Sequence, residues 1–182
     1  ARDFGLLPHL LAGYCGDGDS FALLGRLDER AAAGGSVDES LVIATLYLAP
    51  YLAAFPPRRE SHIVDALHQA AETILPHCRH FSIAQGIRQQ ARELLVACFR
   101  LVRGVGLRGE ARFLRHPLTP LALELFLLYV MDHPPLAELA ARWQGLICRS
   151  GPVAESSGKE KRPRRRRYRR PSRAAGAEKK DP

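Results

Sequence analysis

The chain has 182 residues, of which 46% are hydrophobic and 25% charged, and its formal net charge is +8. The charge is confined to one end, because residues 1–150 carry 15 Arg and 15 acidic residues whereas residues 151–182 carry 12 Lys or Arg and 4 acidic residues. The longest uncharged stretch, residues 40–57, contains Pro50 and Pro56 and is too short and interrupted to span a membrane. No C-x-x-C pair occurs among the four cysteines, so we expect free thiols and a cytoplasmic protein with no membrane partner.

The first half of the chain contains three predicted helices. Residues 20–33 are expected to form the first one. Ser36 and Glu39 match a capping box that opens the second, a strongly apolar segment over residues 37–48 that Pro50 kinks or ends. Residues 61–75 form the third predicted helix, which Pro76 should close.

The longest predicted helix covers residues 83–105. Its apolar residues recur at steps of three or four, which is the period of a helix with one buried face. Ser82 and Gln85 resemble a capping box at its start, and Gly104 with Gly106 marks its end.

Two further helices complete the set. Thr119 supplies a capping hydroxyl and Pro120 a first helical position for an apolar helix over residues 121–131, which we expect to be central. The pair Pro134-Pro135 opens a last helix over residues 136–147. No stretch alternates with period two, so the sequence predicts an all-α body of six or seven helices.

A change in composition after Arg149 divides the chain. Residues 1–149 are predicted to form one helical body, since one core of this size folds alone. Residues 150–182 begin with a polar Gly/Ser-containing stretch and cannot build a core, so we expect a disordered basic tail.

The tail contains seven Arg within residues 162–171. Guanidinium groups pair bidentately with phosphate oxygens and remain charged, so the segment is predicted to be an extended polycation that binds a nucleic acid. A tail that serves only solubility or localisation is the alternative. The candidate RNA-binding residues here are Arg162, Arg164, Arg165, Arg166, Arg167, Tyr168, Arg169 and Arg170, with Tyr168 available to stack on a base.

A second basic feature lies within the body. On a helical wheel, four arginines of the longest helix occupy the side opposite its apolar stripe, and three more follow, against only two acidic residues in this part of the chain. This pattern predicts a cationic ridge that guides RNA, with an ordinary solvated helix face as the alternative. The ridge consists of Arg88, Arg92, Arg100 and Arg103, followed by Arg108, Arg112 and Arg115.

Motifs for catalysis or metal binding are weak in this sequence. His77, Cys78 and His80 do not have the spacing of a structural zinc site, and Asp17-Gly18-Asp19 lacks the ligand ladder of a calcium loop. There is no nucleophile elbow, phosphate-binding glycine loop or H-E-x-x-H motif. We therefore expect no catalytic residue, metal or cofactor in this chain.

Several segments resemble the C-terminal helical region and arginine-rich end of bacterial poly(A) polymerase, a family of the nucleotidyltransferase superfamily that includes the tRNA CCA-adding enzymes. The closest segment is Ala111-Arg112-Phe113-Leu114-Arg115-His116-Pro117, preceded by an Arg- and Gln-bearing helix over residues 87–103. Residues 5–8, 16–20, 41–52, 121–129 and 136–143 are also similar, in the same order, so the resemblance spans nearly the whole chain.

The resemblance implies an enzyme that adds AMP from ATP to RNA 3′ ends, using two metal ions (Mg²⁺) held by carboxylates of an N-terminal head domain. In that head a Gly-Ser pair at a helix start is followed by a strand-borne Asp-x-Asp, and this combination does not occur here. The chain also starts at Ala1 without Met, so we expect a fragment that binds single-stranded RNA 3′ ends, lacks its catalytic domain and is inactive alone. A stand-alone helical scaffold for protein partners, with a nucleic-acid-binding or ribosome-binding tail, is the rival interpretation. A CCA-adding enzyme is disfavoured by the arginine tail.

Overall fold

A computed structural model describes residues 18–58 and 60–150 of the chain. Within these ranges there are seven α-helices and one short 3-10 helix, and no strand, which confirms the predicted all-α class. The elements in chain order are α2 (Gly18–Ala32), α3 (Glu39–Ala54), α4 (Ile63–His80), α5 (Gln85–Arg103), α6 (Glu110–Leu114), α7 (Thr119–Val130), η1 (Pro134–Leu136) and α8 (Ala137–Ser150).

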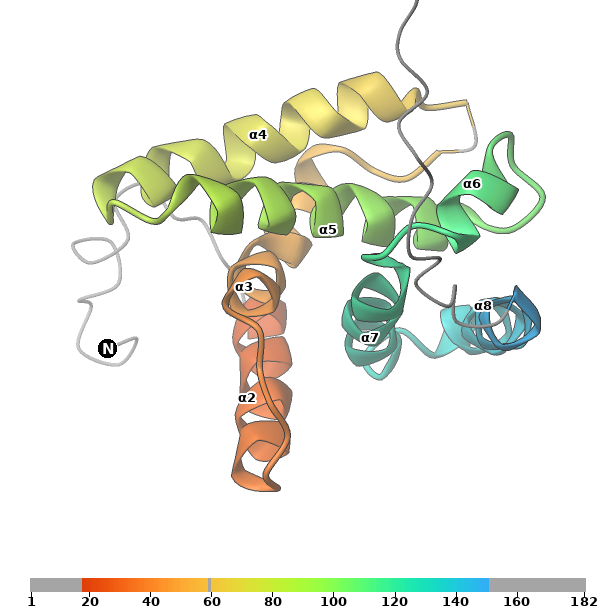
Figure 1. Ribbon diagram of the computed structural model, residues 1–182, viewed down its shortest axis with the longest axis horizontal. Helices are drawn as coiled ribbons and strands as arrows, with labels where there is room; N and C mark the ends of the chain where they lie inside the picture. Colours follow the sequence, from red (N-terminus) through yellow and green to blue (C-terminus); the bar gives the residue numbers. More distant parts are fainter. Residues whose placement is uncertain (1–17, 59, 151–182) are drawn as a thin grey trace, which may run out of the picture. The chain divides into compact units, whose positions relative to one another are not determined.

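Helix α5 lies at the centre of this arrangement. It packs lengthwise against the antiparallel helix α4 and also contacts α3, α7 and α8 (Figure 1). The helix expected over residues 121–131 shares this central position: α7 covers one side of α5 and also contacts α2, α3, α8 and η1. Because α5 is covered on several sides, the middle of the predicted apolar stripe, from Ala91 to Leu101, is fully buried, and so are the neighbouring residues Leu95 and Phe99.

The hydrophobic core is built largely from large side chains of α3, α5 and α7. Tyr51 of α3 and Phe99 of α5 are both inaccessible to solvent, with ring centroids 6.1 Å apart, and Phe55 stacks on Phe99 at 5.3 Å. The hydroxyl of Tyr51 donates a hydrogen bond to the carbonyl of Ala66 in α4 at 3.1 Å. Burial raises the pKa of Tyr51 far above its ordinary value, so this donor stays protonated.

The observed ends of the helices agree less well with the sequence predictions than the presence of the helices does. At α3 the cap is Asp38 and not Ser36: the Asp38 carboxylate accepts from the Ser40 backbone N–H at 2.8 Å and from the Ser40 hydroxyl. The hydrogen bond from the Ser40 side chain lowers the pKa of Asp38 below its ordinary value. The predicted capping box at Ser36 is thus wrong.

Ser82 belongs to the end of α4 and not to the start of α5. It has φ +51, and the Ser82 and Ile83 N–H groups donate to Arg79 and Cys78 carbonyls at 3.1 and 3.0 Å, the pattern of a Schellman motif. Helix α5 then begins after Ala84, which forms no side-chain cap. The capping box predicted at Ser82 is wrong for this reason, whereas Gly104 ends α5 as expected.

Two prolines predicted to interrupt or close helices lie inside them. Pro50 is within α3, which continues to Ala54, and Pro76 is within α4, which continues to His80. Each proline removes one helical hydrogen bond, and the burial of both helices against α5 compensates for that loss. Thr119 also differs from expectation, because it is the first residue of α7 and its hydroxyl donates to the Phe113 carbonyl at 2.5 Å.

The last helix agrees with the prediction. Pro134 and Pro135 open η1, which leads directly into α8. Trp143 of α8 is 1% exposed, donates from Nε1 to the Leu101 carbonyl at 3.0 Å, and packs edge-on against Phe113 at 5.8 Å. Through this residue α8 is fixed to the C-terminal end of α5.

Other expectations meet the structure only in part. Cys78, Cys98 and Cys148 are free thiols, as predicted, while Cys15 lies outside the described residues. No described helix combines the length and apolar character needed to cross a bilayer. The predicted disordered tail, apart from Ser150 at the end of α8, also lies outside the described residues.

Replacing Trp143 with Ala should destabilise the body by about 3 to 5 kcal/mol, because it leaves a cavity and removes the hydrogen bond to Leu101. Urea unfolding followed by circular dichroism measures this change. Met131→Ala is the matched control, since its side chain is 63% exposed and its loss should change stability by less than about 0.5 kcal/mol. Equal effects of the two substitutions would contradict the packing of α8 described here.

Candidate nucleic-acid interface

The arginines of the predicted ridge lie along the contact between α4 and α5, here called the α4–α5 seam. Positions 88, 92, 95, 99 and 103 form one row on α5, but Leu95 and Phe99 in the middle of that row are fully buried. Arg88, Arg92, Arg100 and Arg103 are themselves half-buried. The predicted ridge is therefore not continuous on the surface. The arginines of α5 form two groups, one at each end of the seam.

Arg88 and Arg92 line a groove at one end of the seam. The groove has a volume of about 330 Å³, and its floor is apolar where α4 contributes Ile74 and Leu75. Nε of each arginine is buried and has no hydrogen-bond partner among the described residues. A buried N–H without a partner costs about 1 to 3 kcal/mol, which a bound acceptor would recover. The remaining lining residues are Ala71, Gln85 and Gln89.

Arg100, Arg103 and Arg108 line a second hollow of about 370 Å³ at the other end of the seam. Arg100 donates to the Arg108 carbonyl at 2.7 Å, and Arg103 donates from Nε to the Arg58 carbonyl at 2.9 Å. These bonds to neutral carbonyls fix the direction of the side chains and leave their charge in place. The other lining residues are Ser61, His62, Ile63 and Leu107.

Aromatic rings support the same two guanidinium groups. The guanidinium carbon of Arg100 lies 5.0 Å from the centroid of the Phe113 ring, and that of Arg103 lies 5.7 Å from Phe99. Burial lowers the pKa of Arg100 from its ordinary value, the positive charge of Arg103 lowers it further, and Glu110 acts in the opposite direction. Arginine remains protonated at neutral pH despite such shifts, so the hollow is strongly cationic.

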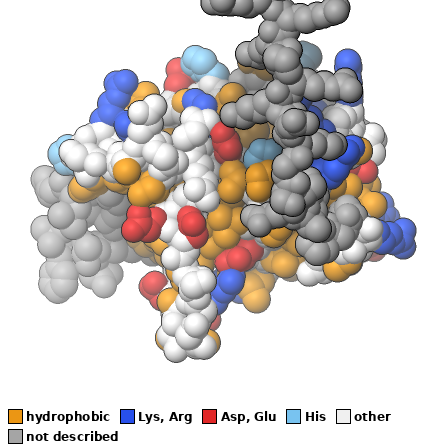
Figure 2. Space-filling model, in the orientation of Figure 1, with side chains coloured by type: hydrophobic (Ala, Val, Ile, Leu, Met, Phe, Trp, Pro, Cys, Tyr) orange, Lys and Arg blue, Asp and Glu red, His pale blue; other side chains and the backbone are white. Residues whose placement is uncertain are grey.

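The last two predicted ridge residues lie apart from both seam groups. Arg112 is in α6 and Arg115 directly follows it, and both are exposed. Arg115 donates from Nε to the Ala111 carbonyl at 3.0 Å. On the face shown in Figure 2, basic side chains occur at several separate places with carboxylates between them, so the charge of the body is distributed in patches.

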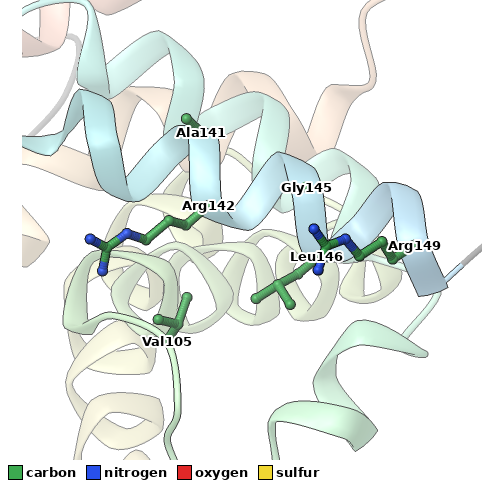
Figure 3. A pocket seen from close by; sticks show the side chains of 6 residues that line it. All are labelled: Val105, Ala141, Arg142, Gly145, Leu146 and Arg149. Atoms are coloured by element: carbon green, nitrogen blue, oxygen red, sulfur yellow. The ribbon is translucent and has the colours of Figure 1, made fainter.

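A third basic hollow, of about 500 Å³, was not predicted from the sequence. Arg142 and Arg149 of α8 lie at its rim, with Gly145 between them on the helix, and Val105 contributes from the loop after α5 (Figure 3). Gly145 leaves this stretch of α8 without a side chain. The signal in the sequence is the seven-residue spacing of Arg142 and Arg149, which places two arginines on one helix face.

Ion pairs hold several other arginines of the body. Arg26 of α2 pairs with Asp132, and Arg30 of α2 pairs with Glu124 of α7, so both neutralise part of their charge within the fold. Arg142 of α8 pairs with Glu138 at 3.9 Å. Among the described residues, no carboxylate lines either of the two hollows at the α4–α5 seam, so the described lining of each hollow is cationic.

The remaining candidate residues carry little additional information. The tail arginines and Tyr168 lie outside the described residues, as does Asp17. His77 and Cys78 are buried, and the His77 ring stacks on Tyr47 at 5.2 Å. In the part of the chain that the structure covers, no three His, Cys, Asp or Glu side chains are arranged to hold a metal ion. No reaction step through a metal is derived from these residues.

Known proteins give no direct indication of what binds at these surfaces. Comparisons with protein-family models, curated proteins and solved structures find no match to this chain. The cationic hollows are therefore interpreted from their charge, burial and hydrogen bonds.

Arg100→Ala should lower the stability of the body by about 1 to 2 kcal/mol, because it removes a charged hydrogen bond to the Arg108 carbonyl and the contact with Phe113. Arg112→Ala, which removes the same charge from an exposed position, should change stability by less than about 0.5 kcal/mol. Chemical unfolding of the two variants tests this difference, and an Arg100→Ala protein as stable as the Arg112→Ala protein would refute the structural role of Arg100.

Proposed function

We propose that this chain is the RNA-binding C-terminal part of a bacterial poly(A) polymerase. The observation that carries the proposal is the set of arginines at the α4–α5 seam, which line two hollows to which the described part of the chain contributes no carboxylate. The tail adds seven arginines in ten residues. Clustered basic groups are the electrostatic signature of a surface for a polyanion.

RNA fits this distribution of charge better than other polyanions do. Guanidinium forks match phosphate oxygens, and the apolar floor beside Arg88 and Arg92 is suited to an unstacked base, which single-stranded RNA exposes and a duplex does not. Tyr168 adds a second stacking surface in the tail. The proposed ligand is therefore a single strand, with its 3′ end directed to the catalytic domain.

The tail and the body have different roles in this proposal. The tail captures RNA through charge that attracts any strand and raises the local concentration of RNA near the body. The half-buried arginines of the body are held by the fold, so they position the captured strand. The transfer of AMP from ATP, with its Mg²⁺ ions, is assigned to the head domain that the family resemblance implies and not to any residue of this chain.

Deletion of residues 151–182 should weaken binding to single-stranded RNA roughly a hundredfold at low salt. It should also make the slope of log K against log salt shallower by about 4, because the tail is expected to make about six phosphate contacts. Filter binding over a salt series measures both quantities. A full-length variant with the seven clustered arginines replaced by Lys is the matched control, since it keeps the charge and should keep most of the slope. Unchanged RNA retention after the deletion would defeat the assignment of the tail.

The purified chain should bind RNA yet incorporate no AMP into it when supplied with ATP and Mg²⁺, because the expected catalytic carboxylates are absent from its sequence. A radiolabelled-ATP incorporation assay measures this, and polymerisation by the chain alone would overturn the assignment. The coding sequence upstream of Ala1 distinguishes the rival scaffold: an open frame with Gly-Ser and Asp-x-Asp supports the polymerase, and a start codon immediately before Ala1 supports the scaffold.

A further inference from the structure

The hollow lined by Arg100, Arg103 and Arg108 has the properties of a specific site and not only of a basic surface. We propose that it seats one phosphate group of a single RNA strand, with His62 at its edge. This inference deepens the proposed RNA binding and rests on it, because it identifies the place on the body where a backbone phosphate is held.

The first argument is that two of the three guanidinium groups are positioned before any ligand arrives. Arg100 and Arg103 each use a hydrogen bond to a backbone carbonyl, of Arg108 and Arg58, and each lies against an aromatic ring. A side chain fixed in this way loses less conformational entropy on binding than a free arginine does.

The second argument is the charge of the hollow. Three guanidinium groups line it, and no carboxylate within residues 18–58 and 60–150 does. Glu110 acts on Arg100 from outside the lining, and its carboxylate accepts the backbone N–H of Gly106 at 2.5 Å. Glu60 and Asp65 are nearby in sequence, but both are exposed and neither lines the hollow. Mutual repulsion of the arginines is relieved when an anion binds between them.

The start of α4 adds to the positive potential. The hollow includes Ser61, His62 and Ile63, which surround the first turn of this 18-residue helix. His62 occupies the cap position and forms no side-chain hydrogen bond to the first turn. The N–H groups of a helix start carry partial positive charge, so they supplement the three arginines at the same place.

A phosphate within a polymer explains the arrangement better than an isolated carboxylate does. A backbone phosphodiester and a carboxylate each carry one charge and two unesterified oxygens that guanidinium groups can bind, so the distinction between them comes from the second basic site. The groove of Arg88 and Arg92 lies about 17 Å away, toward the start of α5, because an α-helix rises about 1.5 Å per residue. A ligand with regularly repeated phosphates can occupy both places at once, and the α4–α5 seam would then direct the strand.

The test uses the full chain with Arg108→Ala. The Arg108 side chain is exposed, and the contact that fixes Arg100 uses the backbone carbonyl of residue 108, which the substitution keeps. The control is Arg79→Ala, which removes the same charge from an exposed position at the end of α4 that lines none of the three hollows. Circular dichroism verifies that both variants are folded.

Binding of a short fluorescent oligoadenylate, measured by anisotropy over a salt series, is the first readout. Arg108→Ala should weaken binding about five- to tenfold and reduce the salt slope by about 0.7 to 1, the contribution of one phosphate contact. Arg79→Ala should change neither. Equal behaviour of the two variants would overturn the site while leaving RNA binding by the chain intact.

Titration of the full chain with inorganic phosphate, followed by the NMR signals of the arginine Nε–H groups, is the second readout. Selective shifts of the Arg100 and Arg103 Nε–H signals would support the anion site. If these shifts occur but the chain does not bind oligoadenylate, the anion site remains and the proposed RNA function fails. Shifts of all arginines to the same extent would overturn the site. Tighter binding of oligoglutamate than of oligoadenylate, lost in Arg108→Ala, would assign the hollow to an acidic protein and overturn the RNA proposal.

Discussion

The burial of α5 among α3, α4, α7 and α8 is the constraint on which the other features of the body depend. Leu94, Leu95, Cys98, Phe99 and Leu101 are inaccessible to solvent, so this helix is fixed along most of its length. Its basic residues can reach solvent only near the ends of the contact with α4. The packing of apolar side chains therefore determines where positive charge appears on the surface.

The fold also determines which arginines remain available. On α2, Arg26 and Arg30 are neutralised by acidic partners and connect that helix to α7 and the turn after it. Beside α5, Arg100 and Arg103 are held by backbone carbonyls and aromatic rings, which orient a guanidinium group without neutralising it. The same residue type thus stabilises the body in one place and offers charge to a ligand in another.

The sequence predicted the helical class and the approximate extent of most helices because apolar residues recur with the helical period. It failed at details that depend on neighbouring helices. Pro50 was expected to kink or end its helix and Pro76 to close the next one, yet both helices continue past these prolines. Ser82 has the residue type of a start cap but lies in the left-handed turn that ends α4, a difference that a local pattern does not reveal.

The sequence predicted which arginines belong to the candidate site but not how they are arranged in space. A helical wheel assigns Arg88 and Arg92 to a free face because it contains no information about α4, which covers that side. The convergence of Arg108 with Arg100 also depends on the loop after α5, whose course the pattern does not specify. Charge segregation between body and tail, in contrast, is a property of the sequence itself.

The central claim is that RNA contacts the arginines at the α4–α5 seam and those of the tail. Ultraviolet crosslinking of the full chain to single-stranded RNA, followed by mass spectrometry of the crosslinked peptides, tests this claim most directly. The account predicts crosslinks within residues 85–108 and within the tail at residues 162–170. Crosslinks concentrated on α2 and α3, with none beside α5, would contradict it.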